Sequence, residues 1–139
     1  MQRRRLEFTE VHSYSGADSG IGVPTVLRCG RNTVDLVATL DTGASHCLFE
    51  QAYALQLELD VASGIRKRFR TANSSFEAFG HEVSVEVFGI VTWSLVYFFG
   101  DPSISKNVLG RNGWLDRVRL GVVDHDCMLY LAGYDHEVD

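Results

Sequence analysis

Short apolar runs separated by clusters of Gly, Ser, Asn and Asp recur along this chain, and they predict strands far more often than helices. The clearest case is the stretch 81–87, where Val83, Val85 and Val87 alternate with polar residues as in a half-buried strand. The stretch 90–99 is more continuously apolar and predicts a more buried strand. Further strands are expected at 6–11, 22–27, 33–40, 46–49, 106–110, 119–123 and 127–131.

Helical patterns are few and short. Residues 50–57 are good helix formers, and residues 112–118 form a second candidate. About nine short strands and one or two short helices predict an all-β domain of the sandwich or closed-barrel type. A length of 139 residues is typical of one domain. We therefore expect a single domain over 1–139, with a core at about 6–131 and a polar tail at 133–139.

The charge of the chain narrows the range of its partners. With 13 basic and 18 acidic side chains the formal net charge is −5, which gives no electrostatic reason to expect a nucleic-acid partner. The two basic clusters, at 3–5 and 66–68, are short and are interpreted as solvated surface. The longest uncharged stretch, 87–100, has 14 residues and is too short to span a bilayer as a helix, so no membrane partner is expected.

The three cysteines, Cys29, Cys47 and Cys127, are odd in number and widely spaced. This pattern argues against a disulfide framework and for a reducing compartment. No CxxC pair is present, so no structural zinc site is expected. The opening residues MQRRRLEF lack the apolar segment of a signal peptide, and together with the cysteines they predict a cytoplasmic location.

One acidic residue interrupts the apolar pattern. The run 37–40 is apolar or β-branched and is expected to be a strand buried on both faces, yet it ends in Asp41. Thr42 and Gly43 follow, and glycine allows the backbone to turn tightly. Because an aspartate is rarely buried unless it is paired or functional, Asp41 is the first candidate for chemistry.

Two carboxylates placed close together cannot both ionise, so such a pair holds one proton and one negative charge. The charged member can take a proton from water while the protonated member polarises a carbonyl group, which is general acid–base catalysis. The segment Asp18-Ser19-Gly20 fits a related pattern, but no strand is expected before it, and we interpret it as a loop turn. The second carboxylate is therefore expected from Asp41 of a second, two-fold-related chain.

Two segments together resemble the retropepsin-like aspartic proteases. They are residues 40–45 (Leu-Asp-Thr-Gly-Ala-Ser) and, further along, residues 107–112 (Asn-Val-Leu-Gly-Arg-Asn). This family comprises the retroviral proteases and their single-domain relatives, and the resemblance extends over about 22–131. It implies the acid-protease type of closed β-barrel or sandwich, and an aspartic endopeptidase that works as a homodimer on extended peptide or protein substrates. The resemblance implies no cofactor and no metal.

The resemblance also implies a role for each residue of the loop. Asp41 would be the catalytic carboxylate, Thr42 would cross-link the two active-site loops, and Gly43 and Ala44 would offer backbone groups to the substrate. Ser45 stands where retroviral members often carry an acidic residue that pairs with an arginine. Since Ala44 has no hydroxyl group to hydrogen-bond the charged carboxylate, we expect activity at milder acidity than in relatives with serine there.

Two further segments complete the implied site. Val108, Leu109 and Gly110 would pack beneath the loop, and Arg111 would brace it with a partner other than the usual acidic residue. A hairpin flap would close over the peptide and add it as a strand. The tip of this flap has no glycine and consists of Thr71, Ala72, Asn73, Ser74 and Ser75.

An alternative from a different class stands beside the enzyme, namely a catalytically silent module of this fold that binds peptides or dimerises. The intact Asp-Thr-Gly segment favours the enzyme, whereas the glycine-free flap and the missing acidic partner of Arg111 favour the module. His46 and Cys47 would point to opposite faces of a strand, which argues against a nucleophilic pair. The segment Asp124-His125-Asp126 is interpreted as a hairpin turn rather than a metal site.

Overall fold

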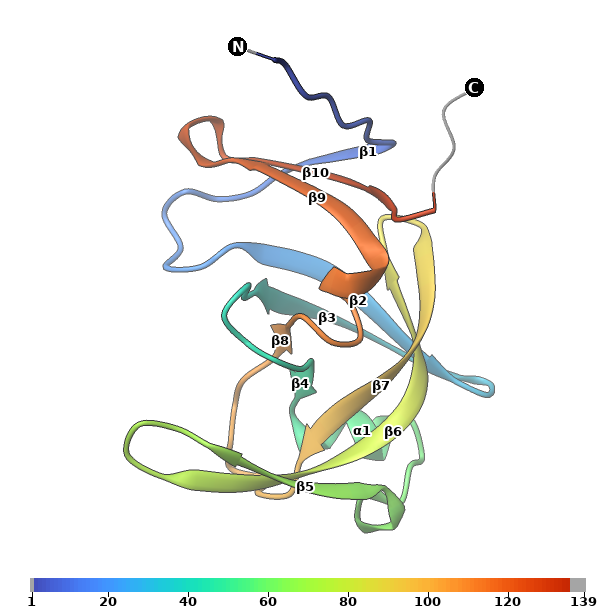
Figure 1. The fold of residues 1–139 in the computed structure, drawn as a ribbon. Helices are drawn as coiled ribbons and strands as arrows, with labels where there is room; N and C mark the ends of the chain where they lie inside the picture. The colour runs from blue at the N-terminus through green and yellow to red at the C-terminus, as the bar shows by residue number, and fades with distance from the viewer. Residues whose placement is uncertain (1, 136–139) are drawn as a thin grey trace.

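The computed structural model describes residues 2–135 (Figure 1). Within this range the chain forms ten strands, one α-helix and three short 3-10 helices. The helices are α1 (Gln51–Gln56), η1 (Val61–Ser63), η2 (Leu115–Arg117) and η3 (Asp124–Asp126). The strands are β1 (Glu10–Ser13), β2 (Gly22–Cys29), β3 (Asn32–Leu40), β4 (Leu48–Phe49), β5 (Ile65–Arg70), β6 (Ser75–Val87), β7 (Ile90–Phe99), β8 (Val108–Leu109), β9 (Val118–Val123) and β10 (Met128–Gly133).

The predicted all-β class is confirmed. Seven strands form one sheet in the order β2-β3-β8-β4-β7-β6-β5, and β2 pairs in addition with β6. Because of this extra pairing the sheet returns on itself, and β5 remains outside the ring as an extension along β6. The long antiparallel β6–β7 pair forms one side of the ring, and the predicted strand 90–99 coincides with β7.

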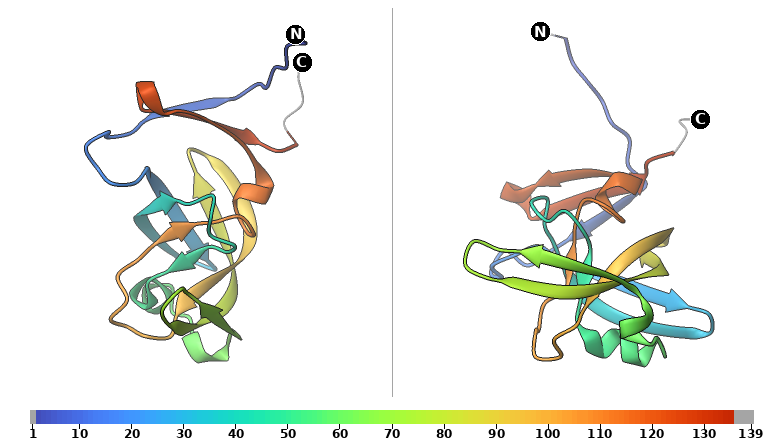
Figure 2. Two further views of the ribbon diagram at one scale, coloured as in Figure 1. Left: turned by 60° about the vertical axis from the view of Figure 1, so that its left-hand side comes forward. Right: turned by 60° about the horizontal axis from the view of Figure 1, so that its bottom comes forward.

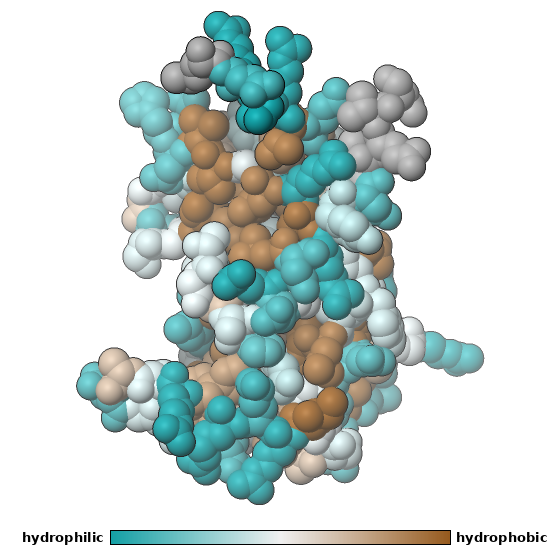
Figure 3. All heavy atoms as spheres, viewed as in Figure 1, coloured by the Kyte–Doolittle hydropathy of each residue, from teal (hydrophilic) through white to brown (hydrophobic). Residues whose placement is uncertain are grey.

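A second, antiparallel sheet has the order β1-β10-β9. It lies at one end of the molecule, next to the N-terminal segment (Figures 1 and 2). Apolar side chains gather on the face that this sheet presents in Figure 3. Three exposed valines belong to the sheet: Val11, Val122 and Val123 keep 57%, 40% and 43% of their surface exposed.

The strand that leads to Asp41 is covered on one face only, so the prediction of a strand buried on both faces is wrong. Leu36 and Ala38 of β3 are buried, whereas Val37 between them is 65% exposed. β3 pairs along its whole length with β2 in an antiparallel hairpin, and one face of such a hairpin can remain in water. Asp41 itself is half-buried rather than deep in the core.

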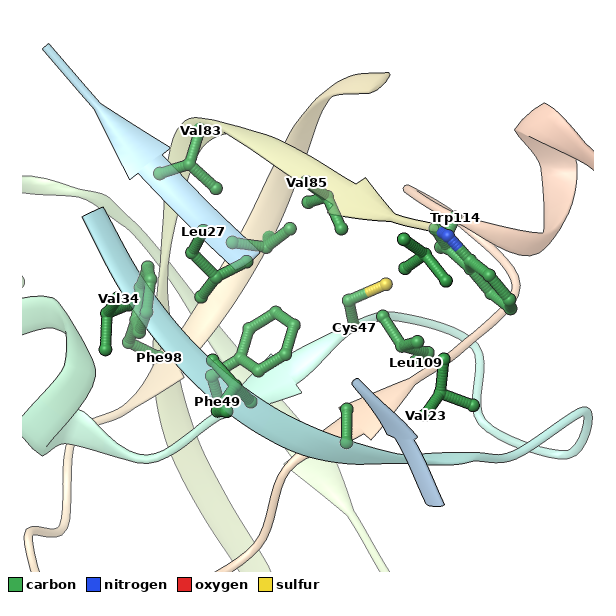
Figure 4. Packing of buried hydrophobic residues seen from close by; sticks show 14 of the residues in the cluster. Val23, Leu27, Val34, Cys47, Phe49, Val83, Val85, Phe98, Leu109 and Trp114 are labelled. Atoms are coloured by element: carbon green, nitrogen blue, oxygen red, sulfur yellow. The ribbon is translucent and has the colours of Figure 1, made fainter. Parts of the chain in front are cut away.

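The main core lies inside the ring and brings together residues from β2, β3, β6, β7 and the segment around β4 (Figure 4). Phe49 and Phe98 pack with ring centroids 6.0 Å apart, and both are fully buried. Burial of one such side chain stabilises the fold by about 1.5–3 kcal/mol. Cys47 and Leu109 belong to the same cluster, so the segments on either side of the Asp41 loop are anchored in the core.

Three boundary predictions are wrong. The first strand is Glu10–Ser13 rather than 6–11, because β1 is defined by its pairing with β10, a partner that local alternation does not reveal. Residues 65–70 form β5, which is not among the strands expected from the sequence. Charged residues are common on such edge strands, where they discourage pairing with other chains. β10 continues to Gly133, inside the expected tail, and residues 136–139 of that tail lie outside the described part.

Other predictions near the C-terminal half are confirmed in outline. The candidate helix at 112–118 contains the 3-10 helix η2, and the predicted hairpin at 119–131 is formed by β9 and β10. The turn between these two strands is η3.

The three cysteines are all free thiols. Among the helices of residues 2–135, none is both long enough and apolar enough to cross a membrane.

Candidate active site

The aspartate loop begins where β3 ends, between two neighbouring segments. The backbone N–H of Leu40 donates to the carbonyl of Ile21 (2.9 Å), and that of Asp41 donates to the carbonyl of Leu109 (3.0 Å). β3 and β8 run parallel, with Thr39 opposite Val108 and Leu40 opposite Leu109. β8 therefore lies beside the end of β3, and Asp41 leaves the sheet from a fixed position.

The loop then turns around the carboxylate. The backbone N–H of Gly43 donates to Oδ1 of Asp41 at 2.9 Å, and the N–H of Ala44 donates to the carbonyl of Asp41 at 3.2 Å. Aspartate side chains commonly close turns in this way, by bonding a backbone N–H two residues further on. The turn fixes one carboxylate oxygen, while Thr42 and Gly43 themselves remain exposed.

A second segment, 110–112, holds the far side of the loop. The N–H of Arg111 donates to the carbonyl of Ala44 (2.9 Å), and the N–H of Asn112 donates to the carbonyl of Ser45 (2.9 Å). The side-chain amide of Asn112 donates to the same Ser45 carbonyl at 2.7 Å. Asn112 was not among the predicted site residues, although it lies in the segment that carries the family resemblance.

Gly110 has no space for a side chain. A Cβ atom at this position would lie 2.2 Å from the carbonyl oxygen of His46 and 2.9 Å from that of Ala44. Both neighbours are backbone atoms, so the close parallel approach of 110–112 to 44–46 requires glycine. This is the physical reason for a glycine in the segment that supports the loop.

Arg111 contacts the loop through its backbone. Its side chain is exposed, and within residues 2–135 its guanidinium group forms no hydrogen bond and no ion pair. The hydroxyl of Ser45 is 2.8 Å from Nδ1 of His46. The side chain at position 45 is therefore directed to its neighbour in sequence.

The flap predicted from the sequence lies on the β5–β6 hairpin, whose tip is the turn between Arg70 and Ser75. The N–H of Thr71 donates to the carbonyl of Ser74 (2.8 Å), and the N–H of Ser74 donates to the hydroxyl of Thr71 (3.1 Å). The tip residues have no left-handed backbone angle, so the turn forms without glycine. The hairpin projects on the same side of the molecule as the Asp41 loop (Figures 1 and 2).

An aromatic group connects the hairpin to the loop. The ring of His46 contacts Phe69 of β5 (centroids 5.4 Å apart) and Tyr97 of β7 (5.3 Å), in both cases edge to face. Phe69 stacks in turn on Phe76 across the hairpin at 5.3 Å. No local pattern pointed to His46 in this role, because the contact joins residues that are 23 positions apart.

The electrostatic setting of His46 is also defined. Burial lowers the pKa of its imidazole below the usual 6.5, and the positive charge of Lys67 lowers it further. Within residues 2–135 no group of three His, Cys, Asp or Glu side chains is arranged to hold a metal ion. Asp18 lies in the exposed loop between β1 and β2, in agreement with its interpretation as a turn residue.

Comparisons with known proteins locate this geometry within a fold family. The sequence matches no family model and no curated protein. Many solved structures match the chain, and three of them cover between 68% and 94% of it. A retropepsin-like aspartic protease from Rickettsia conorii has 19% sequence identity and a TM-score of 0.62, over 94% of this chain and 96% of that protein.

The second structure is the retroviral protease-like domain of Ddi1 from Leishmania major, with 20% identity, a TM-score of 0.59, and coverage of 86% of this chain and 91% of that domain. The third is the EIAV protease in complex with the inhibitor HBY-793, with 18% identity, a TM-score of 0.51, and coverage of 68% and 85%. The chain therefore has the retropepsin-like aspartic protease fold, and the resemblance noted in the sequence is confirmed at the level of the fold.

Proposed function

We propose that this chain is an aspartic endopeptidase that acts as a homodimer. The observation that carries the proposal is the position and the bonding of the Asp41 carboxylate. Its carboxylate stands at the end of β3, is oriented by the N–H of Gly43, and forms no ion pair within residues 2–135. The loop around it is fixed on both sides by backbone hydrogen bonds. A rigid and half-exposed carboxylate is suited to meet a second one.

The chemistry follows from two such groups across a two-fold axis. The pair shares one proton, and the charged carboxylate takes a proton from a water molecule as the water oxygen attacks the peptide carbonyl carbon. The protonated carboxyl donates its proton to the carbonyl oxygen. One hydroxyl of the resulting diol gives its proton to the carboxylate that is now charged, and the C–N bond breaks. The other carboxyl gives its proton to the leaving nitrogen, so the pair again holds one proton. The proposed reaction uses no covalent enzyme intermediate, no metal and no cofactor.

Exposed features of the chain support a partner copy. Thr42 and Gly43 are at the surface of the isolated chain, directly beside the carboxylate that needs a second copy. The sheet β1-β10-β9 adds the exposed valines Val11, Val122 and Val123. Burial of such apolar surface in a symmetric contact favours association. A substrate peptide would lie between the loops and the β5–β6 hairpin as an added strand.

The silent module of the same fold stays the second candidate, and two observations favour it. The flap tip is closed by bonds between Thr71 and Ser74, which holds the turn in one shape. The guanidinium group of Arg111 has no partner among the described residues that would brace the loop through its side chain. Neither feature removes the carboxylate, and for that reason the enzyme is the preferred proposal.

The test is cleavage of a mixed peptide library by the wild type and by Asp41→Asn. We expect the substitution to reduce cleavage by about 10²- to 10⁴-fold or more, because it removes the proton-transferring group. Asp35→Asn, on the exposed face of the same strand, and Asp18→Asn are the matched controls and should cleave as the wild type does. If both the wild type and Asp41→Asn bind peptides and neither cleaves them, the endopeptidase proposal is rejected and the silent peptide-binding module is supported.

Sedimentation at several protein concentrations tests the stoichiometry. We expect activity per chain to rise with the dimer fraction, because one chain supplies one catalytic carboxylate. A protein that cleaves peptides while it remains monomeric at every concentration would contradict the shared site.

A further inference from the structure

The edge strand β5 is strongly basic. Its six residues, 65–70, include four basic side chains, in a chain whose net charge is −5. The strand alternates, so these charges lie on two faces. On one face Arg66 and Arg68 both form ion pairs with Glu77 of β6, at 2.6 and 3.1 Å. Arg66 and Arg68 thus share the one negative charge of Glu77 within the hairpin.

Lys67 lies on the other face. It shares that face with Ile65 and Phe69, and its partner across the hairpin is the fully buried Ala78. Its Nζ is 5.7 Å from the centre of the Phe69 ring. Within residues 2–135 the ammonium group forms no ion pair, and the side chain is exposed. Lys67 is therefore an uncompensated cation with a fixed aromatic neighbour.

This face of β5 adjoins the active-site loop. Phe69 contacts the ring of His46 at 5.4 Å, and His46 in turn holds the hydroxyl of Ser45 at 2.8 Å. Burial and the charge of Lys67 lower the pKa of His46 and so disfavour its charged form, and Lys67 is the fixed cation of this group. A peptide that lies between the loop and the hairpin would pass along this group of side chains.

We propose that Lys67, with Phe69 and His46 as apolar walls, forms a cationic subsite that selects a glutamate or aspartate side chain of the substrate peptide. The inference rests on the proposed function, since it assigns the substrate class of the same cleft. A peptide added as a strand presents alternate side chains to such pockets. A carboxylate there gains the partner that Lys67 lacks.

The experiment compares peptide pairs that differ by Glu or Gln at one position, scanned along a cleaved sequence at pH 6, where the glutamate is ionised. For wild type we expect one position at which Glu raises kcat/KM about 2- to 5-fold over Gln, the range for a partly exposed ion pair. Lys67→Gln should bring this ratio to about one, while total cleavage of the Gln peptide persists. The ratio should also fall at about 1 M salt, where charges are screened.

Arg70→Gln is the matched control. It removes the same charge from the same strand, but Arg70 shares a face with Arg66 and Arg68. We expect Arg70→Gln to retain the wild-type preference for Glu. An equal loss of the preference for Glu in Lys67→Gln and Arg70→Gln would show that the preference comes from the overall positive charge of the strand and not from a subsite at Lys67. No preference for Glu in wild type, or a preference unchanged in Lys67→Gln, would overturn the proposal.

A binding measurement separates this inference from the proposed function. Peptide pairs with a reduced, uncleavable bond are titrated into Asp41→Asn and into the double variant with Lys67→Gln. Tighter binding of the Glu peptide that depends on Lys67 supports the subsite even if no peptide is ever cleaved. Equal binding of Glu and Gln peptides rejects the subsite even if cleavage by wild type is efficient.

Discussion

The tightest contact in the site predicts a severe effect of Gly110→Ala. The new Cβ would lie 2.2 Å from the carbonyl oxygen of His46, whereas contacts of this kind below 3.0 Å essentially do not occur. Because both sides of the contact are backbone, rotation of a side chain cannot relieve it. The segments 110–112 and 44–46 must separate by most of an ångström.

The magnitude follows from the bonds that this separation weakens. Overpacking of a rigid site costs about 1–3 kcal/mol. Loss or lengthening of one of the hydrogen bonds from Arg111 to Ala44 or from Asn112 to Ser45 adds about 1 kcal/mol. We therefore expect a loss of about 2–4 kcal/mol in the free energy of unfolding, and a fall of Tm by about 8–15 °C for a chain of this size.

The assay is thermal and urea denaturation of Gly110→Ala beside Gly30→Ala. Gly30 lies in the β2–β3 turn with a left-handed φ of 59°, and a Cβ there meets no atom within 4 Å. The control therefore loses only the conformational preference of glycine, about 1 kcal/mol. If Gly110→Ala proves no less stable than Gly30→Ala, the two segments are not locked by backbone contact and the reasoning is refuted.

Measuring the catalytic activity of Gly110→Ala provides a second test. The displaced loop carries Asp41, and a shift of about 1 Å in a reacting group can reduce the rate about 10²-fold. At a temperature where the variant is still folded, we expect kcat to fall more than KM rises. Retention of the wild-type kcat by a destabilised protein would show that the loop moves as a rigid unit with its support.

Three other predictions concern single groups of the site. Ala44→Ser adds a hydroxyl that can hydrogen-bond the charged carboxylate, so the acidic limb of the pH–rate profile should move to lower pH, and an unchanged limb would contradict this. Burial raises the pKa of Cys47 to about 12, so iodoacetamide at pH 8 should label at most the other two cysteines until the protein unfolds; mass spectrometry of the native protein decides. Burial and the charge of Lys67 lower the pKa of His46, so NMR should show it titrating below 6.5, and Lys67→Gln should raise that value. The folded state then binds fewer protons at His46 than the unfolded state does, so the contribution of this residue reduces the stability of the fold as the pH falls below about 6.5. A measured pKa of His46 at or above 6.5 would contradict the placement of His46 and Lys67.

Local pattern in the sequence was sufficient for the class of fold and for the catalytic candidate. Alternation over 81–87 and the apolar run 90–99 predict the two longest strands, and both coincide with parts of β6 and β7. Asp41 stands out because a carboxylate directly follows an apolar strand. Such features depend on neighbours in the chain, and for that reason they can be identified without coordinates.

Local pattern failed where an element is defined by a distant partner. β1 is shifted relative to its predicted position because its register depends on β10, and β5 was missed because its pairing with β6 outweighs the polar composition of 65–70. β3 was expected to be buried on both faces because Val37 is apolar, but Val37 shares a face with Asp35 and is 65% exposed.

The candidate site divides in the same way. Local sequence pattern pointed to the Asp-Thr-Gly loop, the segment 108–111 and a hairpin tip at 71–75. Three contacts became visible only in the folded chain: Gly110 has no room for a side chain, Asn112 holds the carbonyl of Ser45, and His46 connects the loop to Phe69. Each of these contacts joins residues that are far apart in sequence, and their distances are set by how the strands close into a ring rather than by any local preference.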